Sequence, residues 1–162
     1  MVIETNWDAS TGQFAANFRD KNSAGDSNAG PGLQFLQINL RYCHFGYTLL
    51  QQFLRTKSVD VILIQDPPKA ILSGEGFFPG YNVNLPTTFD PDDHANRPLV
   101  AILIRSSLHF QPLPSPSQRV CGVLVSTRHG PVAFISAYIR HSDGDGLGTL
   151  VDFVTATRPR TP

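Results

Sequence analysis

The sequence predicts a mixed α/β domain that opens with a strand, a helix and a second strand and continues with antiparallel strands. Residues 33–40 carry apolar side chains on both alternations, which is typical of a strand covered on both faces. Residues 59–64, VDVILI, form a second apolar run that is rich in β-branched side chains and too short for a helix. Between these runs, apolar residues recur at helical spacing: Gly46, Leu49, Leu50, Phe53 and Leu54.

A polar residue stands at the end of each predicted strand, Asn39 at the first and Asp66 at the second. A strand, a covering helix and a strand in this order most often form a parallel crossover, and parallel strands finish at the same edge of a sheet. We therefore expect Asn39 and Asp66 to lie side by side, at the edge where open α/β sheets keep their ligand sites.

The rest of the chain is predicted as strands, loops and one helix. The acidic loop at residues 86–98 is expected to be solvated, because it lacks the glycine and the closing glutamate of a calcium loop. The proline-rich residues 111–118 are interpreted as an extended connector. Further strands are expected at residues 81–85, 99–104, 120–127 and 132–138, the last two as a hairpin. The apolar face of the last helix is expected to comprise Leu147, Leu150, Val151 and Val154.

The domain is expected to occupy residues 33–157, between a disordered polar tail at residues 1–32 and a short tail at residues 158–162. The first tail contains the segment NSAGDSNAGPG, which is small, polar and without periodicity. Such a segment cannot bury enough surface to offset its ordering entropy.

Composition limits the class of protein. The chain of 162 residues has room for one domain, and it is 41% hydrophobic with 16% charged residues and no net charge. Without a basic excess, charge alone does not indicate nucleic-acid binding. Cys43 and Cys121 have neither the spacing of a metal site nor that of a disulfide framework. No apolar run is long enough to span a membrane, and no secretory signal is present, so we expect an intracellular protein of the cytoplasm or nucleus.

Four stretches together resemble a known family. LQINL, followed by a helix and then VDVILIQDPP, is similar to the opening of the endonuclease domain in non-LTR retrotransposon polyproteins. RPLVAILIRSS and VAFISAYIRHS look like later strands of that domain, in the same order. The resemblance covers roughly residues 33–157 and implies the endonuclease/exonuclease/phosphatase superfamily, with the DNase I-like four-layer αββα sandwich.

The resemblance implies a role for three residues. Asn39 matches the asparagine that orients the scissile phosphate and its attacking water, and Tyr138 matches the tyrosine that contacts the phosphate from the far side. Asp66 matches the metal-binding acid, which is usually glutamate in the family, so the shorter side chain is a departure. The implied cofactor is Mg²⁺, a hard cation that prefers oxygen ligands, and the implied partner is DNA.

Two blocks that the family carries after its tyrosine have no match in this sequence. They are a Gly-Asp-x-Asn block and a closing Ser-Asp-His block, which supply the base and the closing histidine. Asp143 and Asp145 are flanked by glycine as in a turn, and His141 lies too close to Tyr138 to be that histidine. We therefore expect about half of the domain, and no cleavage of DNA by this chain on its own.

Two classes of function remain open from the sequence. The first is a magnesium-dependent phosphodiesterase that nicks DNA, of which this is the amino-terminal part. The second is a non-catalytic relic of that domain, either inert or a weak nucleic-acid binder, in which Asn39 and Asp66 are ordinary turn residues and Tyr138 is a core residue. A third reading is a phosphatase of the same superfamily, and the LQINL opening argues against it.

Overall fold

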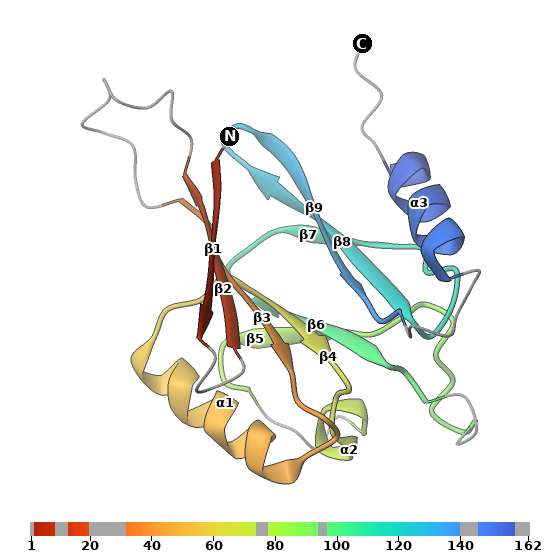
Figure 1. Ribbon diagram of the computed structural model, residues 1–162, viewed down its shortest axis with the longest axis horizontal. Helices are drawn as coiled ribbons and strands as arrows, with labels where there is room; N and C mark the ends of the chain where they lie inside the picture. Colours follow the sequence, from red (N-terminus) through yellow and green to blue (C-terminus); the bar gives the residue numbers. More distant parts are fainter. Residues whose placement is uncertain are drawn as a thin grey trace.

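The computed structural model describes residues 32–73, 78–93, 97–139 and 146–157, together with the backbone of two strands before them. The strands are β1 (Val2–Asp8), β2 (Gln13–Arg19), β3 (Gln34–Asn39), β4 (Val61–Gln65), β5 (Tyr81–Asn84), β6 (Val100–Arg105), β7 (Phe110–Leu113), β8 (Val120–Thr127) and β9 (Gly130–Ala137). The helices are α1 (His44–Thr56), α2 (Lys69–Leu72) and α3 (Gly146–Thr157). The strands form a six-stranded sheet in the order β1-β2-β3-β4-β6-β5 and a three-stranded sheet in the order β7-β8-β9 (Figure 1).

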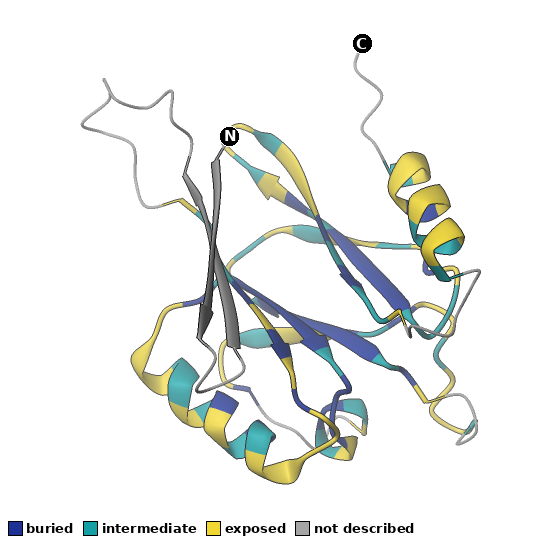
Figure 2. Cartoon of the chain, viewed as in Figure 1, coloured by how far each residue is buried: buried dark blue, intermediate teal, exposed yellow. Residues whose placement is uncertain are grey.

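Strand β4 has apolar side chains on both faces because each face is covered by a different layer. Ile62 and Ile64 belong to a core cluster with Leu50 of α1, whereas Val61 and Leu63 belong to a second cluster with residues of β8. Helix α3 covers the opposite face of the small sheet, since its buried Phe153 lies against Gly122 of β8. The buried residues accordingly follow the strands between the two outer helices (Figure 2). The order helix, sheet, sheet, helix is the αββα sandwich that the resemblance implied, and the fold class is confirmed.

The pairing of the central strands sets the geometry of the site. Strands β3 and β4 are parallel, with Asn39 opposite Gln65, as the strand–helix–strand pattern predicted. Strand β6 runs antiparallel to β4, with Val100 opposite Gln65. The ends of β3 and β4 and the start of β6 therefore meet at one edge of the large sheet.

The first part of the chain differs from the expected disordered tail. Residues Val2–Asp8 and Gln13–Arg19 form a β-hairpin, and β2 pairs with β3. Two features of the sequence favour this pairing: Phe14, Ala16 and Phe18 alternate as in a strand, and β3 would otherwise present an unpaired edge. The low-complexity segment at residues 20–31 lies outside the described residues, as do residues 158–162.

Part of the expected proline-rich connector is also a strand. Residues Phe110–Leu113 form β7, which pairs with β8 and places Pro112 opposite Val123. Strand β7 is the edge of the small sheet, where a proline removes no needed hydrogen bond. The short helix α2 lies in a stretch for which no helix was predicted.

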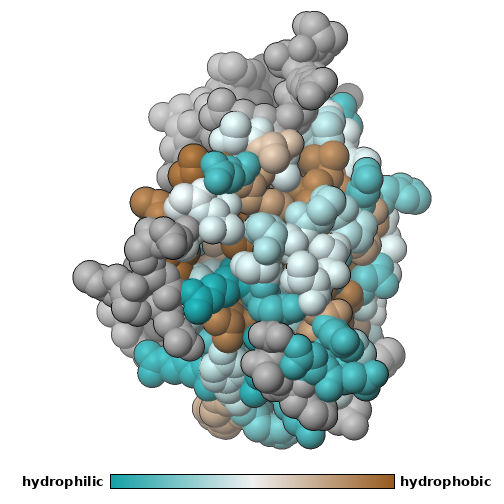
Figure 3. Space-filling view, turned by 90° about the vertical axis from the view of Figure 1, so that its right-hand side faces the viewer, coloured by the Kyte–Doolittle hydropathy of each residue, from teal (hydrophilic) through white to brown (hydrophobic). Residues whose placement is uncertain are grey.

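Helix α3 forms where a helix was predicted, but with a different buried face. Its buried residue is Phe153, whereas Leu147 is 61% exposed and Val151 is 54% exposed. The helix contacts the sheet at Gly122, where the missing side chain leaves room for one large ring. On the side of the molecule where α3 lies, hydrophobic side chains reach the surface (Figure 3). Among the described helices, none has the length and the apolar character needed to cross a membrane.

Candidate functional site

Asn39 and Asp66 lie in contact at the edge where β3 and β4 end. The amide Nδ2 of Asn39 donates a hydrogen bond of 3.1 Å to Oδ2 of Asp66. The amide oxygen Oδ1 of Asn39 accepts a hydrogen bond of 2.8 Å from the backbone N–H of Arg41. The predicted placement of the two residues is confirmed, and the Asn39 side chain is held from both ends.

The backbone turns sharply as it leaves each strand. Arg41, Tyr42 and Asp66 all have positive φ, at 49°, 55° and 47°. Residues other than glycine rarely adopt this left-handed region, and such strain gathers at functional sites. Two backbone hydrogen bonds, from Leu40 N–H to the Gln65 carbonyl at 2.9 Å and from Tyr42 N–H to the Asp66 carbonyl at 2.8 Å, tie the two turns together.

Asp66 is buried with only part of its hydrogen-bonding capacity used. The residue is 7% exposed, and its Oδ2 atom accepts the bond from Asn39. Its Oδ1 atom is buried and has no hydrogen-bond partner among the described residues. A buried, unpaired carboxylate oxygen costs free energy, and a hard cation bound to it would remove that cost. The donor is of the kind that Mg²⁺ prefers, so the site fits this ion.

Tyr42 and Arg97 flank Asp66, and the sequence analysis did not identify either of them. The guanidinium carbon of Arg97 lies 4.3 Å from the centroid of the Tyr42 ring, and Nη2 of Arg97 donates a hydrogen bond of 2.8 Å to the Pro67 carbonyl. Burial and, after it, the neighbouring Asp66 carboxylate raise the pKa of the Tyr42 hydroxyl to about 12, while Arg97 acts in the opposite direction. The tyrosine is therefore a neutral hydrogen-bond donor at neutral pH.

The sequence shows Arg97 just before a predicted strand, but it does not show that this strand pairs with β4. The residue stands just before β6, and a strand antiparallel to β4 starts at the edge where β4 ends. Because residues 86–98 are acidic, they were interpreted as a solvated loop, and Arg97 near the end of this loop was not considered as a site residue.

Tyr138 reaches the same edge from the small sheet. It follows β9, and its backbone N–H donates a hydrogen bond of 2.9 Å to the Arg119 carbonyl. One residue earlier, the Ala137 carbonyl accepts a hydrogen bond of 2.8 Å from Nε2 of Gln65, at the end of β4. Tyr138 also contributes to the raised pKa of Tyr42. The structure thus brings all three predicted site residues to one edge of the sandwich.

Within the described part of the chain, no group of three or more histidine, cysteine, aspartate or glutamate side chains could hold a metal ion. An ion at Asp66 would therefore take its other ligands from water or from a bound phosphate, as Mg²⁺ commonly does. His141, Asp143 and Asp145 lie outside the described residues.

The fold is similar to that of a solved endonuclease. No protein-family model matches the sequence, and no curated protein matches it. Among solved structures, the endonuclease domain of TRAS1, a telomere-specific non-LTR retrotransposon, matches with a TM-score of 0.60 at 20% sequence identity. The match covers 78% of this chain and 54% of that chain, so the present chain spans about half of that domain. The chain therefore has the fold of about half of an endonuclease domain.

Proposed function

We propose that the chain is the amino-terminal part of a metal-dependent, DNA-nicking endonuclease domain. The part of its active site that binds metal and phosphate is the Asp66 site, where Asn39, Asp66, Tyr42, Arg97 and Tyr138 come together. The observation that carries the proposal is the buried, unpaired Oδ1 atom of Asp66 beside the fixed amide of Asn39. The similarity in fold to the TRAS1 endonuclease domain supports the kind of substrate.

Asp66 would hold a Mg²⁺ ion through Oδ1, with water or phosphate oxygens completing the ligand set. A bound ion of this kind polarises the phosphoryl group and stabilises charge on the leaving oxygen. The Asp66 carboxylate is suited to this role because the hydrogen bond from Asn39 to its Oδ2 atom fixes the orientation of the side chain.

The remaining side chains are suited to holding the phosphate. The Asn39 amide has two N–H donors and spends one on Asp66, which leaves the second for a phosphate oxygen. Arg97 is exposed, and its guanidinium has donors beyond the one that binds the Pro67 carbonyl. The stacked Tyr42 ring holds that guanidinium in place, and Tyr138 approaches from the small sheet.

Hydrolysis also needs a base for the attacking water, and nothing in the sequence after Tyr138 matches the family's base or its closing histidine. General-base assistance typically contributes about 10²–10⁴ in rate, and catalytic groups that act as a unit lose most of their effect when one is removed. The chain as given should therefore bind metal and DNA phosphate without cleaving DNA above background.

Duplex binding separates this proposal from an inert relic. In the presence of Mg²⁺, a labelled DNA duplex should bind about tenfold more weakly to Asp66→Ala and to Arg97→Gln, because each change removes a charged contact worth about 1.5–3 kcal/mol. Arg128→Gln, at the exposed β8–β9 turn, is the matched control and should bind as the unaltered chain does. Equal affinity for all four proteins would identify a relic and overturn the proposal.

A nicking assay on supercoiled plasmid tests the expected lack of cleavage. The unaltered chain should produce no nicked circles above background with or without Mg²⁺. Magnesium-dependent nicking that disappears in Asp66→Ala would show that a base is present, with His141, Asp143 and Asp145 as the first residues to test.

A further inference from the structure

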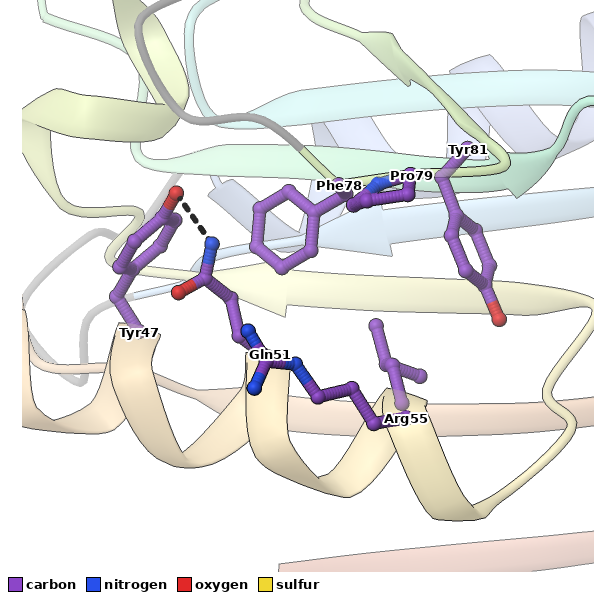
Figure 4. A pocket seen from close by; sticks show the side chains of 7 residues that line it. Tyr47, Gln51, Arg55, Phe78, Pro79 and Tyr81 are labelled. Carbon is purple, nitrogen blue, oxygen red and sulfur yellow. Dashed lines mark hydrogen bonds between the residues drawn. The ribbon is translucent and has the colours of Figure 1, made fainter.

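A pocket lies along α1, and none of its lining residues belongs to the Asp66 site. Its volume is about 450 Å³, which is within the range of small-molecule sites. Tyr47, Gln51 and Arg55 line one side from three successive turns of α1, and the segment from Phe78 to Tyr81 lines the other (Figure 4).

The aromatic wall of this pocket is held rigidly. Gln51 Nε2 donates a hydrogen bond of 2.9 Å to the Tyr47 hydroxyl, and the rings of Tyr47 and Phe78 meet edge to face at 5.2 Å (Figure 4). The Tyr81 hydroxyl donates a hydrogen bond of 2.6 Å to the Val59 carbonyl. Tyr47 is 8% exposed and Phe78 is 4% exposed, so these two rings support the wall from behind. The partly exposed Tyr81, whose hydroxyl is already bonded, offers the ring surface that suits a flat apolar group in the pocket.

The pocket continues into a basic hollow of about 440 Å³, with which it shares Arg55 and Tyr81. Three cationic residues line the hollow: Arg55, Lys57 and Arg105. Arg105 is paired with Asp60 at 3.2 Å, so its charge is compensated. Arg55 and Lys57 are exposed, and neither forms an ion pair within the described ranges. Two cations are thus available to an anionic ligand beside the aromatic wall.

We infer that this groove binds one nucleotide unit of a single-stranded nucleic acid, with the base against the aromatic wall and the adjoining phosphates at Arg55 and Lys57. Single-stranded nucleic acid is bound by this combination of aromatic rings and a positively charged groove. The charge of the ligand is complementary to the two free cations, and its base matches the apolar pocket beside them. The inference does not rest on the proposed function, because the two sites have no residue in common.

The test compares a fluorescein-labelled twelve-nucleotide thymidine strand with an abasic strand of the same length, by fluorescence anisotropy in EDTA. Stacking of a base on aromatic side chains is typically worth ~1–3 kcal/mol, so the thymidine strand should bind about fivefold or more tightly than the abasic one. EDTA removes any divalent ion from Asp66, so the measured affinity does not depend on metal binding there. A negative result would therefore concern the groove alone.

The charged half of the groove is tested by the double variant Arg55→Gln/Lys57→Gln. Each phosphate contact on a single strand contributes roughly 0.7 to the slope of log affinity against log salt, so the double variant should lower that slope by about 1.4. Arg55→Gln should weaken binding, while Arg128→Gln, a matched change at the β8–β9 turn, should not. All three changes are at exposed positions, and thermal melts confirm that the variants fold.

Three results would overturn the inference. They are equal affinity for the thymidine and abasic strands, an unchanged salt slope in the double variant, and tighter binding of an acidic tyrosine-containing peptide than of the oligonucleotide. The last result would assign the groove to a protein partner. Displacement of the labelled strand by thymidine monophosphate at high concentration would support a site for a single nucleotide unit.

Discussion

Asp66 is a charged residue in a buried position with one oxygen unpaired and a backbone in the left-handed region. Each of these features costs stability, and none is needed to end a strand, since asparagine would also fit there. A residue that is present despite this loss of stability is expected to bind a ligand rather than to stabilise the fold.

Asp66→Asn is therefore expected to stabilise the metal-free protein. The change removes a buried charge, keeps the size of the side chain and retains a residue type that tolerates positive φ. Removal of the buried charge should raise the free energy of unfolding in EDTA by about 1–3 kcal/mol, measured by urea denaturation. Asp152→Asn, at an exposed position on α3, is the control and should have little effect. A loss of stability in Asp66→Asn would mean that the carboxylate serves the fold.

The two cysteines should differ sharply in reactivity. Cys43 is exposed, whereas Cys121 lies between the two sheets and accepts a hydrogen bond of 3.0 Å from Asn84 Nδ2. Burial raises the pKa of the Cys121 thiol to about 12, although the Asn84 bond lowers it, so almost no thiolate forms at pH 8. A thiol-specific colorimetric reagent should react rapidly with one thiol in the native protein and with two in denaturant. Similar rates for both thiols in the native protein would contradict the packing of the two sheets.

At the scale of elements, the small sheet and α3 depend on a glycine. A Cβ atom at Gly122 would lie 2.9 Å from Cζ of Phe153 and 3.1 Å from Cδ1 of Leu113, which is too close on both sides. The glycine therefore sets how closely α3 approaches β8.

Gly122→Ala should destabilise the protein by about 1–3 kcal/mol through overpacking, measured by thermal or urea unfolding. Gly148→Ala offers the opposite case, because a Cβ atom on that glycine of α3 would meet nothing within 4 Å. Alanine is favoured over glycine in a helix, so this variant should gain up to about 1 kcal/mol. Equal effects of the two changes would show that α3 does not pack on Gly122.

The central elements were predictable from local patterns, and the edges were not. Strands β4 and β8 are recognisable as apolar runs because both of their faces are largely buried, whereas β3 and β9 are recognisable from one buried face. The segment of β7 contains proline, and its strand character depends on β8 beside it. The packed face of α3 likewise could not be read from its own periodicity, since Gly122 on another element selects Phe153.

The site was likewise predictable only where it follows from local sequence patterns and not where it depends on long-range contacts. Asn39 and Asp66 stand at the ends of strands whose pairing follows from the strand–helix–strand order, so their contact could be expected. Arg97 joins them only because β6 pairs with β4, which is a long-range contact. Tyr42 lies beside Asp66 because its backbone has a positive φ, and the neighbouring sequence does not indicate that conformation.

At the scale of the whole molecule, the two sheets are well packed against each other, but apolar surface remains at the outside. The inner faces of β6 and β8 are buried. Exposed apolar residues lie instead on the edge strand β9 and on α3, among them Val132, Leu147, Val151 and Val154. Exposed edges and apolar patches of this kind promote association.

The isolated chain should therefore be marginally stable or associate as its concentration rises, measured by light scattering after size exclusion. Leu147→Glu/Val151→Glu, on the exposed side of α3, should increase the monomer fraction, while Ala156→Glu serves as a control for added charge on the same helix. A cooperative thermal transition from a stable monomer of the unaltered chain would contradict this expectation.

The most direct test of the proposed function is Mn²⁺ binding, followed by the loss of the free-ion electron paramagnetic resonance signal. Mn²⁺ accepts the same oxygen ligands as Mg²⁺ and has a signal that reports binding without any need for catalysis. The unaltered chain should bind one ion weakly and release it to excess Mg²⁺, Asp152→Asn should do the same, and Asp66→Asn should bind none. Binding by Asp66→Asn equal to that of the unaltered chain, or no binding by the unaltered chain, would contradict the assignment of Asp66 as the metal ligand.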